Sequence, residues 1–359
     1  MSDDDAGDPI AGGKPSDAAM ARSAALVGRT LLDRYRIDEL AAAGGLAAVF
    51  RASRLSDGQE VAIKVLHPDA EGLPELVERF QREGIAGKHI LHPNVVAVHE
   101  IAEIEDGSYF LVQEFVRGRT LRSLIREGPL DPLRAARITR QLAAALTAAH
   151  DFGIVHRDVK PLNVMVLDRD PASPDAEQVK LIDFGLAKVP VEELSVLDGA
   201  GRRSLTAAGV VMGTVAYMAP EAALGMRSID ARSDLYALGV ILYEMLAGKH
   251  PFDATEPGAL FAQQRNDLPP PIAVRSPGVK VPRALEAVMN KLLEKDPEAR
   301  YPRARALTVA LDDAIRELEW ESSDSALRRR ALWRSRLRAA GLAALALLVA
   351  VILWALLRR

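Results

Sequence analysis

The stretch "HRDVKPLNVM", residues 156–165, lies near the middle of a 359-residue chain and intersperses charged and amide side chains with apolar ones. Other polar residues stand in a fixed order around it. Lys64 lies in the strand-like run "VAIKVL", where an unpaired ammonium would be costly to bury. Glu83, on the helical run that follows, is its natural partner, and "LIDFGLAK" (181–188) comes after the opening stretch. The order of these motifs carries more information than any one of them.

The surrounding segments predict an α+β architecture of two lobes. Strand-like runs alternate with one helical run over residues 34–116, which predicts a five-stranded sheet with a single helix. After Gly118 the chain changes to long helical patterns rich in Ala and Leu. We therefore expect a small sheet lobe over residues 34–116 joined to a larger helical lobe over residues 117–316.

Two further motifs complete the set, "GTVAYMAPE" (213–221) and "SDLYALGVILYEMLAGKHPF" (233–252). A lone DFG or a lone lysine in a strand is more often structural than catalytic. HRD-x4-N followed by DFG and APE, however, is the signature set of protein kinases. The chain resembles the eukaryotic-like Ser/Thr protein kinases of bacteria over about residues 34–316. The resemblance implies a bilobal protein-kinase-like fold and phosphoryl transfer from ATP to Ser or Thr hydroxyls of proteins.

The same resemblance implies a role for each polar residue in that transfer. Lys64, held by Glu83, would grip the α- and β-phosphates of ATP. Asp158 would orient the attacking hydroxyl and accept its proton. Lys160 would steady the γ-phosphate, and a lysine at this place marks the Ser/Thr branch of the family.

Two oxygen-bearing side chains are the expected metal ligands. Asn163 and Asp183 would hold Mg²⁺, with Mn²⁺ as an alternative, because hard cations prefer carboxylate, amide and phosphate oxygens. By resemblance, His156 is a structural core histidine and Arg157 pairs with a phosphorylated loop. Three more charged residues resemble internal braces of the family: Asp234, Glu221 and Arg300.

Adenine recognition is expected on the interlobe segment "VQEFV" (112–116). The family pattern assigns the adenine edge to the Glu114 carbonyl and the Val116 backbone, with Gln113 as gatekeeper. Val49 and Ala62 would cover the faces of the ring, although both are equally compatible with an ordinary apolar core.

The segment "AAAGGLAAVF" (41–50) takes the place of the G-x-G-x-x-G loop that covers the phosphates. Ala42 replaces the first glycine, Gly44 is the second and Ala47 replaces the third. Alanine at a positive-φ position would cost about 1–2 kcal/mol, whereas in extended backbone it costs almost nothing. We expect ATP binding to be retained. The residues of this loop predicted to contact nucleotide are Ala42, Ala43, Gly44 and Gly45.

The altered loop leaves a second hypothesis open, a pseudokinase scaffold that binds nucleotide or partners without transfer. Losses in that class usually include the strand lysine or the aspartates of HRD and DFG, and all three are present in this chain. The sequence therefore favours an active enzyme.

The segment between DFG and APE offers hydroxyls for regulatory phosphorylation. A phosphate there would pair with Arg157 and order the loop. Thr206 and Ser204 are the first candidates, followed by Ser195. Thr214 resembles the threonine that contacts the catalytic loop and helps to shape the substrate groove, so we expect it to stay unmodified.

Composition excludes several other classes of function. The 49 acidic and 46 basic residues give a net charge of -3, which provides no electrostatic case for nucleic-acid binding. Cysteine is absent, so disulfides, thiolate zinc sites and a cysteine nucleophile are excluded. Residues 1–33 are rich in Asp, Ala, Gly and Ser with little apolar periodicity, and we expect a mostly disordered acidic tail.

The C-terminal part predicts membrane attachment. Residues 339–357, "AAGLAALALLVAVILWALL", lack charged side chains and match the length of a transmembrane helix. A basic juxtamembrane segment (317–338) precedes them, and two residues (358–359) follow. The arginine bias predicts a single-pass protein of the inner membrane with its kinase domain in the cytoplasm. The arginines from Arg328 to Arg338 are expected to contact anionic lipids.

Small residues in the same apolar segment raise a hypothesis about self-association. Alanines four positions apart, such as Ala339 and Ala343, would let two membrane helices pack closely as a homodimer. Ala-rich composition also produces such pairs by chance. The expected partners are thus ATP, protein substrates, the membrane and a second copy of the chain.

Overall fold

The computed structural model describes residues 15–44, 47–67, 74–104, 107–168, 177–183, 215–225 and 228–323. The chain divides into two compact units, Met1–Asp312 and Asp313–Arg359. In the second unit the described residues, 313–323, are helical. The first unit contains all the strands and the predicted kinase motifs that the structure describes.

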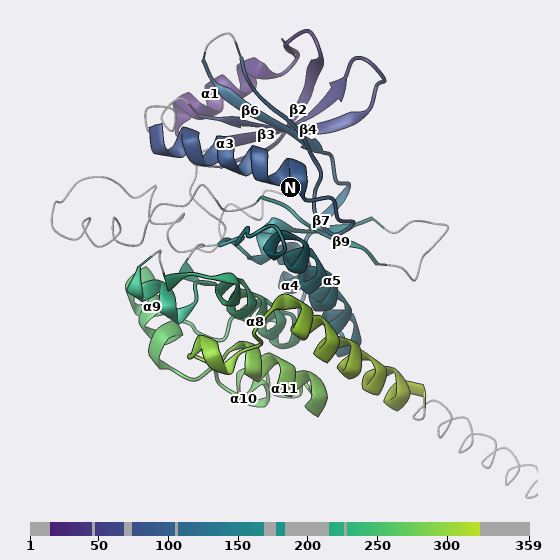
Figure 1. The fold of residues 1–359 in the computed structure, drawn as a ribbon, viewed down its shortest axis with the longest axis vertical. Helices are drawn as coiled ribbons and strands as arrows, with labels where there is room; N and C mark the ends of the chain where they lie inside the picture. Colours follow the sequence, from purple (N-terminus) through teal and green to yellow (C-terminus); the bar gives the residue numbers. More distant parts are fainter. Residues whose placement is uncertain are drawn as a thin grey trace, which may run out of the picture. The chain divides into compact units, whose positions relative to one another are not determined.

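A six-stranded sheet forms the N-terminal lobe, in the order β1-β2-β3-β4-β6-β5 with every neighbouring pair antiparallel (Figure 1). Large side chains such as Phe50, Ile63 and Phe110 are fully buried in its core. The five predicted strands are present, and a two-residue strand is added at the edge of β2. The strands are β1 (Thr30–Leu31), β2 (Tyr35–Ala43), β3 (Ala47–Arg54), β4 (Glu60–Leu66), β5 (Val98–Glu103) and β6 (Tyr109–Glu114).

The helix α3 (Pro74–His89) lies close against this sheet (Figure 1). Phe80 is buried on its sheet-facing side, and two glycines continue that side at the next turns. A Cβ added at Gly84 would come within 2.9 Å of Ile101, and one added at Gly87 within 2.5 Å of Val98. The absence of side chains at these two positions therefore lets the helix backbone approach β5.

Helices make up the C-terminal lobe, as the sequence predicts. α8 lies at its centre and is apolar on all sides, so nearly all of its side chains are buried. The Asp230 carboxylate caps its first turn and Gly248, at φ +68°, ends it. The helices are α4 (Leu121–Arg126), α5 (Pro132–His150), α8 (Ala231–Ala247), α9 (Pro257–Asn266), α10 (Ile272–Arg275) and α11 (Arg283–Leu292), with 3-10 turns η2 (Pro161–Asn163), η4 (Pro220–Leu224) and η6 (Pro297–Ala299).

A second, three-stranded sheet carries the polar loops of the helical lobe. It consists of β7 (Gly118–Thr120), β8 (Val164–Leu167) and β9 (Val179–Leu181), and it follows directly on the connection from the first sheet. Asn94, in the "HPN" segment, ties this sheet to the first lobe. Its carbonyl accepts a hydrogen bond from the Leu181 N–H and its Nδ2 donates to the Val179 carbonyl, both at 2.8 Å. The sheet lobe and the helical lobe of the predicted α+β fold are both confirmed.

The N-terminal region differs from the expectation of disorder over residues 1–33. Residues Asp17–Leu26 form the helix α1, whose first turn is capped by the Ser16 hydroxyl. Ala19, Ser23 and Leu26 recur at helical spacing and are buried, with Leu26 in the core of the six-stranded sheet. Small side chains can pack against a surface without a strongly apolar composition, which is why composition misses this helix. Residues 1–14 lie outside the described part of the chain.

The predicted membrane span, 339–357, lies outside the described residues, as do the arginines from Arg328 to Arg338. Among the helices that the structure describes, none combines the length and the apolar character needed to cross a bilayer. The segment predicted to precede the membrane begins as helix, which the structure describes as far as residue 323.

If α1 belongs to the folded domain, truncating its buried leucine should destabilise the protein. We expect Leu26→Ala to lower the free energy of unfolding by about 2–5 kcal/mol, because it removes buried methyl groups from the sheet core. The matched control is Met20→Ala in the same helix, where the side chain is 41% exposed and the change should stay within about 0.5 kcal/mol. Urea unfolding measures both. Equal effects would show that α1 does not pack on the sheet.

Candidate active site

One face of the first sheet brings together the residues predicted to contact nucleotide. In antiparallel pairs, residues directly opposite each other share a face. Ala42 is opposite Val49 on β2 and β3, and Val49 is opposite Lys64 on β3 and β4. Ala62 lies two residues before Lys64 and therefore on the same face, opposite Gln113 of β6. This register places Val49, Ala62 and Lys64 on one face of the sheet, which Arg51, opposite Ala62, shares.

Lys64 reaches the second lobe. Its Nζ lies 3.0 Å from Asp183 Oδ1 and 6.0 Å from the centre of the Phe80 ring on α3. Both charged side chains are only partly exposed, 15% for Lys64 and 30% for Asp183. Glu83 lies on α3, one turn beyond Phe80, but its side chain is outside the described part of the structure. The predicted convergence of residues 64 and 183 is present, whereas the Lys64–Glu83 pair stays a prediction.

The stretch 156–165 places its polar residues around the Asp158 carboxylate. Lys160 Nζ lies 3.1 Å from Asp158 Oδ2, and Asn163 Nδ2 donates to the same oxygen at 3.1 Å. Asn163 Nδ2 also donates to the Asp158 carbonyl at 2.9 Å. These contacts hold the Asp158 carboxylate, the Lys160 ammonium and the Asn163 amide next to one another in the segment 158–163.

A buried carboxylate on α8 holds the backbone of this loop. Asp234, 1% exposed, accepts hydrogen bonds from the His156 and Arg157 N–H groups, each at 2.8 Å. His150 Nε2 lies 2.8 Å from the same carboxylate. Arg157 has φ +62°, a conformation that a non-glycine residue adopts only at a cost of roughly 1–3 kcal/mol. Asp234 offsets that cost by bonding the strained backbone, so its prediction as a brace fits the structure.

The two expected metal ligands lie side by side across the β8–β9 hairpin. Val164 pairs with Leu181, and the Ile182 N–H donates to the Asn163 carbonyl at 2.8 Å. Asp183 follows with φ +55°, a second strained residue at the site. Because Asn163 Nδ2 is turned to Asp158, its Oδ1 faces the other way. One carboxylate and one amide oxygen fit Mg²⁺, which usually completes its shell with phosphate and water oxygens.

The phosphate-loop segment tolerates its alanines. Ala42 and Ala47 lie in the strands β2 and β3, and neither is among the described residues with positive φ. The cost considered for strained alanine therefore does not apply to them. The Gly44 N–H donates to the Ala47 carbonyl at 3.0 Å, which closes the hairpin. Gly45 lies outside the described residues.

A histidine that the sequence analysis did not consider holds this loop from the neighbouring strand. His67 directly follows β4 and is 2% exposed, and its Nε2 lies 3.0 Å from the Gly44 carbonyl. A ring N–H donating to that carbonyl fixes the orientation of the Gly44 peptide. The sequence signal was a polar residue immediately after "VAIKVL", which is too common to be recognised without the contact.

The interlobe segment is anchored through the Glu114 side chain. Its Oε2 accepts hydrogen bonds from Lys180 Nζ at 2.8 Å and from the Ala97 N–H at 3.3 Å. The carboxylate is thus used to hold β5 and β9, which fits the expectation that only the Glu114 backbone faces adenine. Gln113 is buried and Val116 is partly exposed. Their roles toward adenine stay predictions.

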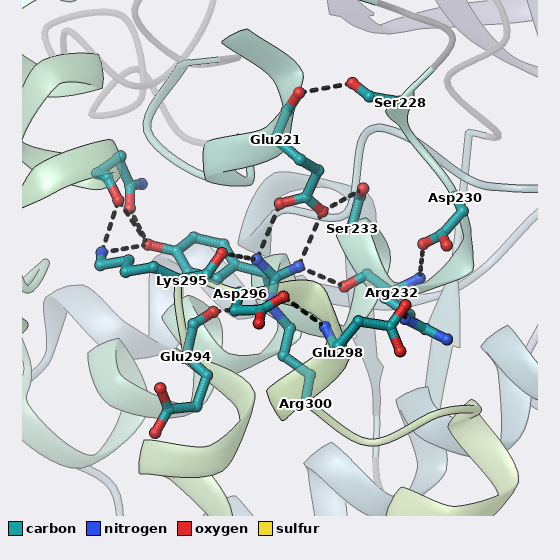
Figure 2. A network of polar contacts seen from close by, with 12 residues as sticks. Glu221, Ser228, Asp230, Arg232, Ser233, Glu294, Lys295, Asp296, Glu298 and Arg300 are labelled. Carbon is teal, nitrogen blue, oxygen red and sulfur yellow. Dashed lines mark hydrogen bonds and ion pairs between the residues drawn. The ribbon is translucent and has the colours of Figure 1, made fainter. Parts of the chain in front are cut away.

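A buried ion pair braces the region after "APE" (Figure 2). The two terminal nitrogens of the Arg300 guanidinium, Nη1 and Nη2, donate to the Glu221 carboxylate at 2.8 Å, and Ser233 Oγ adds a third bond at 2.6 Å. Burial alone would raise the pKa of Glu221, but the hydrogen bonds and charge of Arg300 outweigh it and lower that pKa. The stabilisation is present above the ordinary glutamate range and is lost as the pH falls through the lowered value. The predicted structural role of both residues agrees with this geometry.

The residues predicted to carry phosphate, Thr206 and Ser204, lie outside the described part of the chain, together with Ser195 and Thr214. Within the residues that the structure describes, no cluster of three or more His, Asp or Glu side chains forms a separate metal site.

Comparison with known families identifies the family of the chain. The model of the protein kinase domain family matches residues 35–310, so the chain belongs to the protein kinase family. Serine/threonine-protein kinase pkn3 of Myxococcus xanthus is 39% identical over 85% of this chain and 54% of its own length. Serine/threonine-protein kinase PknB of Mycobacterium tuberculosis is 37% identical over 78% of this chain and 43% of its own length. The chain thus matches about half, or less, of each of these relatives.

Solved structures agree on the fold. The kinase domain of Mycobacterium tuberculosis PknI, as a C20A_R136A double mutant, superposes with a TM-score of 0.60 over 80% of this chain and 98% of its own. Residues 1–466 of Rad53, solved in complex with AMP-PNP, give a TM-score of 0.61 over 78% of this chain and 66% of their own. Both are 24% identical to this chain, so they establish the architecture only. The family implies use of ATP and a divalent metal, which the oxygen ligands described above accommodate.

If His67 fixes the phosphate loop, removing its side chain should weaken the binding of ATP but not that of adenosine, which has no phosphates. We expect His67→Ala to weaken ATP binding roughly fivefold, the equivalent of one hydrogen bond, and to leave adenosine binding unchanged. His99→Ala on β5, an exposed histidine away from the loop, is the control and should change neither. Isothermal titration calorimetry measures the affinities of the wild type and of both variants for the two ligands. An equal loss for ATP and adenosine would contradict a specific effect on the loop.

Proposed function

We propose that this chain is an active Ser/Thr protein kinase that transfers the γ-phosphate of ATP to hydroxyls of protein substrates. The observation that carries the proposal is the 3.0 Å approach of Lys64 Nζ to Asp183 Oδ1 across the two lobes. This contact brings the strand ammonium and a carboxylate expected to bind metal to one point, beside which a triphosphate would lie. The relatives named as serine/threonine-protein kinases support the choice of acceptor.

Each residue of the site has a physical task in this proposal. Lys64 neutralises charge on the phosphates, while Lys160, 3.1 Å from Asp158 Oδ2, places a second cation near the reacting groups. Asp158 orients the acceptor hydroxyl and takes up its proton. Asp234 keeps the loop in the strained shape that aims Asp158. Together these contacts fix orientation before the substrate arrives.

Mg²⁺, or Mn²⁺ in its place, would be held by Asp183 Oδ1 or Oδ2 and by Asn163 Oδ1. When bound, the metal neutralises phosphate charge and aligns the transferred group. The glycine-to-alanine replacements do not oppose this assignment, because Ala42 and Ala47 occupy unstrained strand positions. The structure therefore favours catalysis over the pseudokinase alternative.

The direct test is incorporation of labelled phosphate from Mg²⁺-ATP by the full chain. We expect autophosphorylation by the wild type and a loss of at least about a hundredfold in Asp158→Asn, which keeps the shape of the side chain but cannot accept the proton. No incorporation by either protein would support the scaffold hypothesis, whereas equal incorporation by both would contradict the role assigned to Asp158. Mass spectrometry of the same samples locates the phosphate, with Thr206 and Ser204 as the first candidates and Arg157 as their partner.

The sequence further supports attachment of this kinase to the inner membrane. The 19 uncharged residues 339–357 match a transmembrane helix, and the arginines between Arg328 and Arg338 would stay on the cytoplasmic side with the kinase domain. Contact of those arginines with anionic lipids and pairing of two such helices as a homodimer would follow from the same segment. The near-neutral charge balance gives no electrostatic case for nucleic-acid binding.

Membrane attachment is tested by flotation with vesicles that contain anionic lipids. In 1 M salt, which shortens the Debye length to about 3 Å, we expect the full chain to float and a chain ending at residue 338 to remain at the bottom. At low salt the truncated chain should float in part through its arginines. If the full chain stays at the bottom in both conditions, the membrane proposal is rejected.

A further inference from the structure

The segment just before the "APE" motif is held in place through hydrogen bonds to one of its backbone carbonyls. Residues 215–218 form a short turn, closed by a hydrogen bond from the Met218 N–H to the Val215 carbonyl at 3.1 Å. The Ala216 carbonyl at its centre accepts hydrogen bonds from two side chains, Gln264 Nε2 on α9 and His250 Nε2 at 2.8 Å. Ala216, Val215 and Tyr217 are all buried. Hydrogen bonds from two side chains therefore hold the Ala216 carbonyl on the buried side of the turn.

A directed chain of hydrogen bonds leads to this carbonyl from Lys295, a half-buried residue that follows α11. Lys295 Nζ donates to the Tyr236 hydroxyl oxygen at 3.1 Å and to the Gln264 carbonyl at 2.6 Å. The Tyr236 hydroxyl donates to Gln264 Oε1 at 2.7 Å, and the Gln264 amide donates to Ala216. Figure 2 shows Lys295 reaching this group beside the Glu221–Arg300 ion pair.

The direction of the bonds in this chain is set from both ends. The Ala216 carbonyl can only accept, so the Gln264 amide nitrogen faces it. An ammonium has three donors and no acceptor, so the Tyr236 oxygen facing it must accept, and the hydroxyl proton points to Gln264 Oε1. Without the ammonium, the Tyr236 hydroxyl can rotate, and the Gln264 side chain and carbonyl lose the donors that hold them in place.

The surroundings hold the ammonium at this point. Its Nζ lies 5.4 Å from the centre of the Tyr236 ring and 5.0 Å from that of Phe252, positions suited to cation–π attraction. Tyr236 and Gln264 are fully buried. Such a fully bonded polar group in a core specifies a single arrangement, because each unmade bond would leave a buried polar atom unpaired.

We propose that Lys295 is a positioning residue for the protein-substrate site: through Tyr236 and Gln264 it holds the Ala216 carbonyl and the turn 215–218 in the shape that receives the acceptor peptide. This inference rests on the proposed kinase function. The turn directly follows Thr214, the residue that the family resemblance assigns to the substrate groove. Lys295 acts on the peptide through the turn and does not itself touch ATP or the transferred phosphate.

The first test is steady-state kinetics with the peptide "AGRRSLTAAGV", residues 200–210 of this chain, as acceptor. We expect Lys295→Met to raise the KM for peptide about tenfold while the KM for ATP and kcat stay within twofold, because only the turn is disturbed. Lys295→Arg retains the donors and the charge and should restore most of the affinity. A parallel rise in the KM for ATP, or no change in the KM for peptide, would overturn the proposal.

The matched control lies on α11. Lys291 Nζ sits 4.7 Å from the centre of the Tyr301 ring, so Lys291→Met also removes a lysine–aromatic contact but none of the chain to Ala216. It should leave both KM values unchanged. Melting temperatures of the two methionine variants separate a loss of fold from a loss of peptide affinity. If Lys291→Met raises the KM for peptide as much as Lys295→Met, the effect is general and the proposal fails.

A pH profile gives a readout that a merely structural lysine would not change. Burial, with a smaller contribution from the charge of Arg300, lowers the pKa of Lys295 to about 8, while Asp267 acts in the opposite direction. The pKa of Tyr236 is raised by burial, so its hydroxyl keeps its proton throughout this range. Between pH 7 and pH 9 the KM for peptide should rise in the wild type and stay flat in Lys295→Arg. Parallel profiles would contradict a role for the ammonium.

Hydrogen–deuterium exchange tests the same idea without catalysis. In nucleotide-free full-length protein, backbone amides of residues 215–222 should exchange at least about tenfold faster in Lys295→Met than in the wild type or in Lys291→Met. This measurement decides the positional role even if the wild type transfers no phosphate, so failure of the kinase proposal and failure of this inference give different results. Unchanged exchange in the turn would reject the inference.

Discussion

The candidate active site depends on one buried carboxylate, that of Asp234 at the start of α8. It is 1% exposed and accepts the backbone N–H groups of His156 and Arg157, so its desolvation is balanced by directed bonds. Because α8 is buried on all sides, the carboxylate has a rigid support. The catalytic loop can therefore hold a positive-φ arginine and keep Asp158, Lys160 and Asn163 in one turn.

A second constraint joins the lobes at the nucleotide site. Lys64 comes from a strand whose register also places Val49 and Ala62 on its face, while Asp183 comes from the end of a hairpin in the other lobe. Their 3.0 Å contact requires both supports to be correct at the same time. His67 and Glu114 stabilise the phosphate loop and the interlobe segment with bonds to backbone groups.

The proposed substrate side follows the same design, with polar groups in the core orienting a short backbone segment. The Glu221–Arg300 pair and the chain from Lys295 to Ala216 are adjacent, since Arg300 also donates to the Lys295 carbonyl, and they hold the two ends of the stretch 216–221. An ion pair resists the separation of its members, whereas a directed hydrogen-bond chain sets the orientation of a peptide group. The ion pair thus fixes the position of this segment, and the hydrogen-bond chain fixes the orientation of its Ala216 peptide group.

The sequence by itself predicted the two lobes and the strands between residues 35 and 114, because periodicity is a local property of the chain. Motif spacing is local too, and it singled out Lys64, Asp158, Asn163 and Asp183 as the candidate site residues. It missed α1, whose small buried residues resemble a disordered composition, and it left open whether Ala42 and Ala47 were strained. Only the tertiary structure decided these points and revealed His67 and Lys295. Their partners, Gly44 and the Tyr236–Gln264 pair, are 23 or more residues away in the chain. No local pattern records such contacts, since folding alone brings the groups within hydrogen-bond distance.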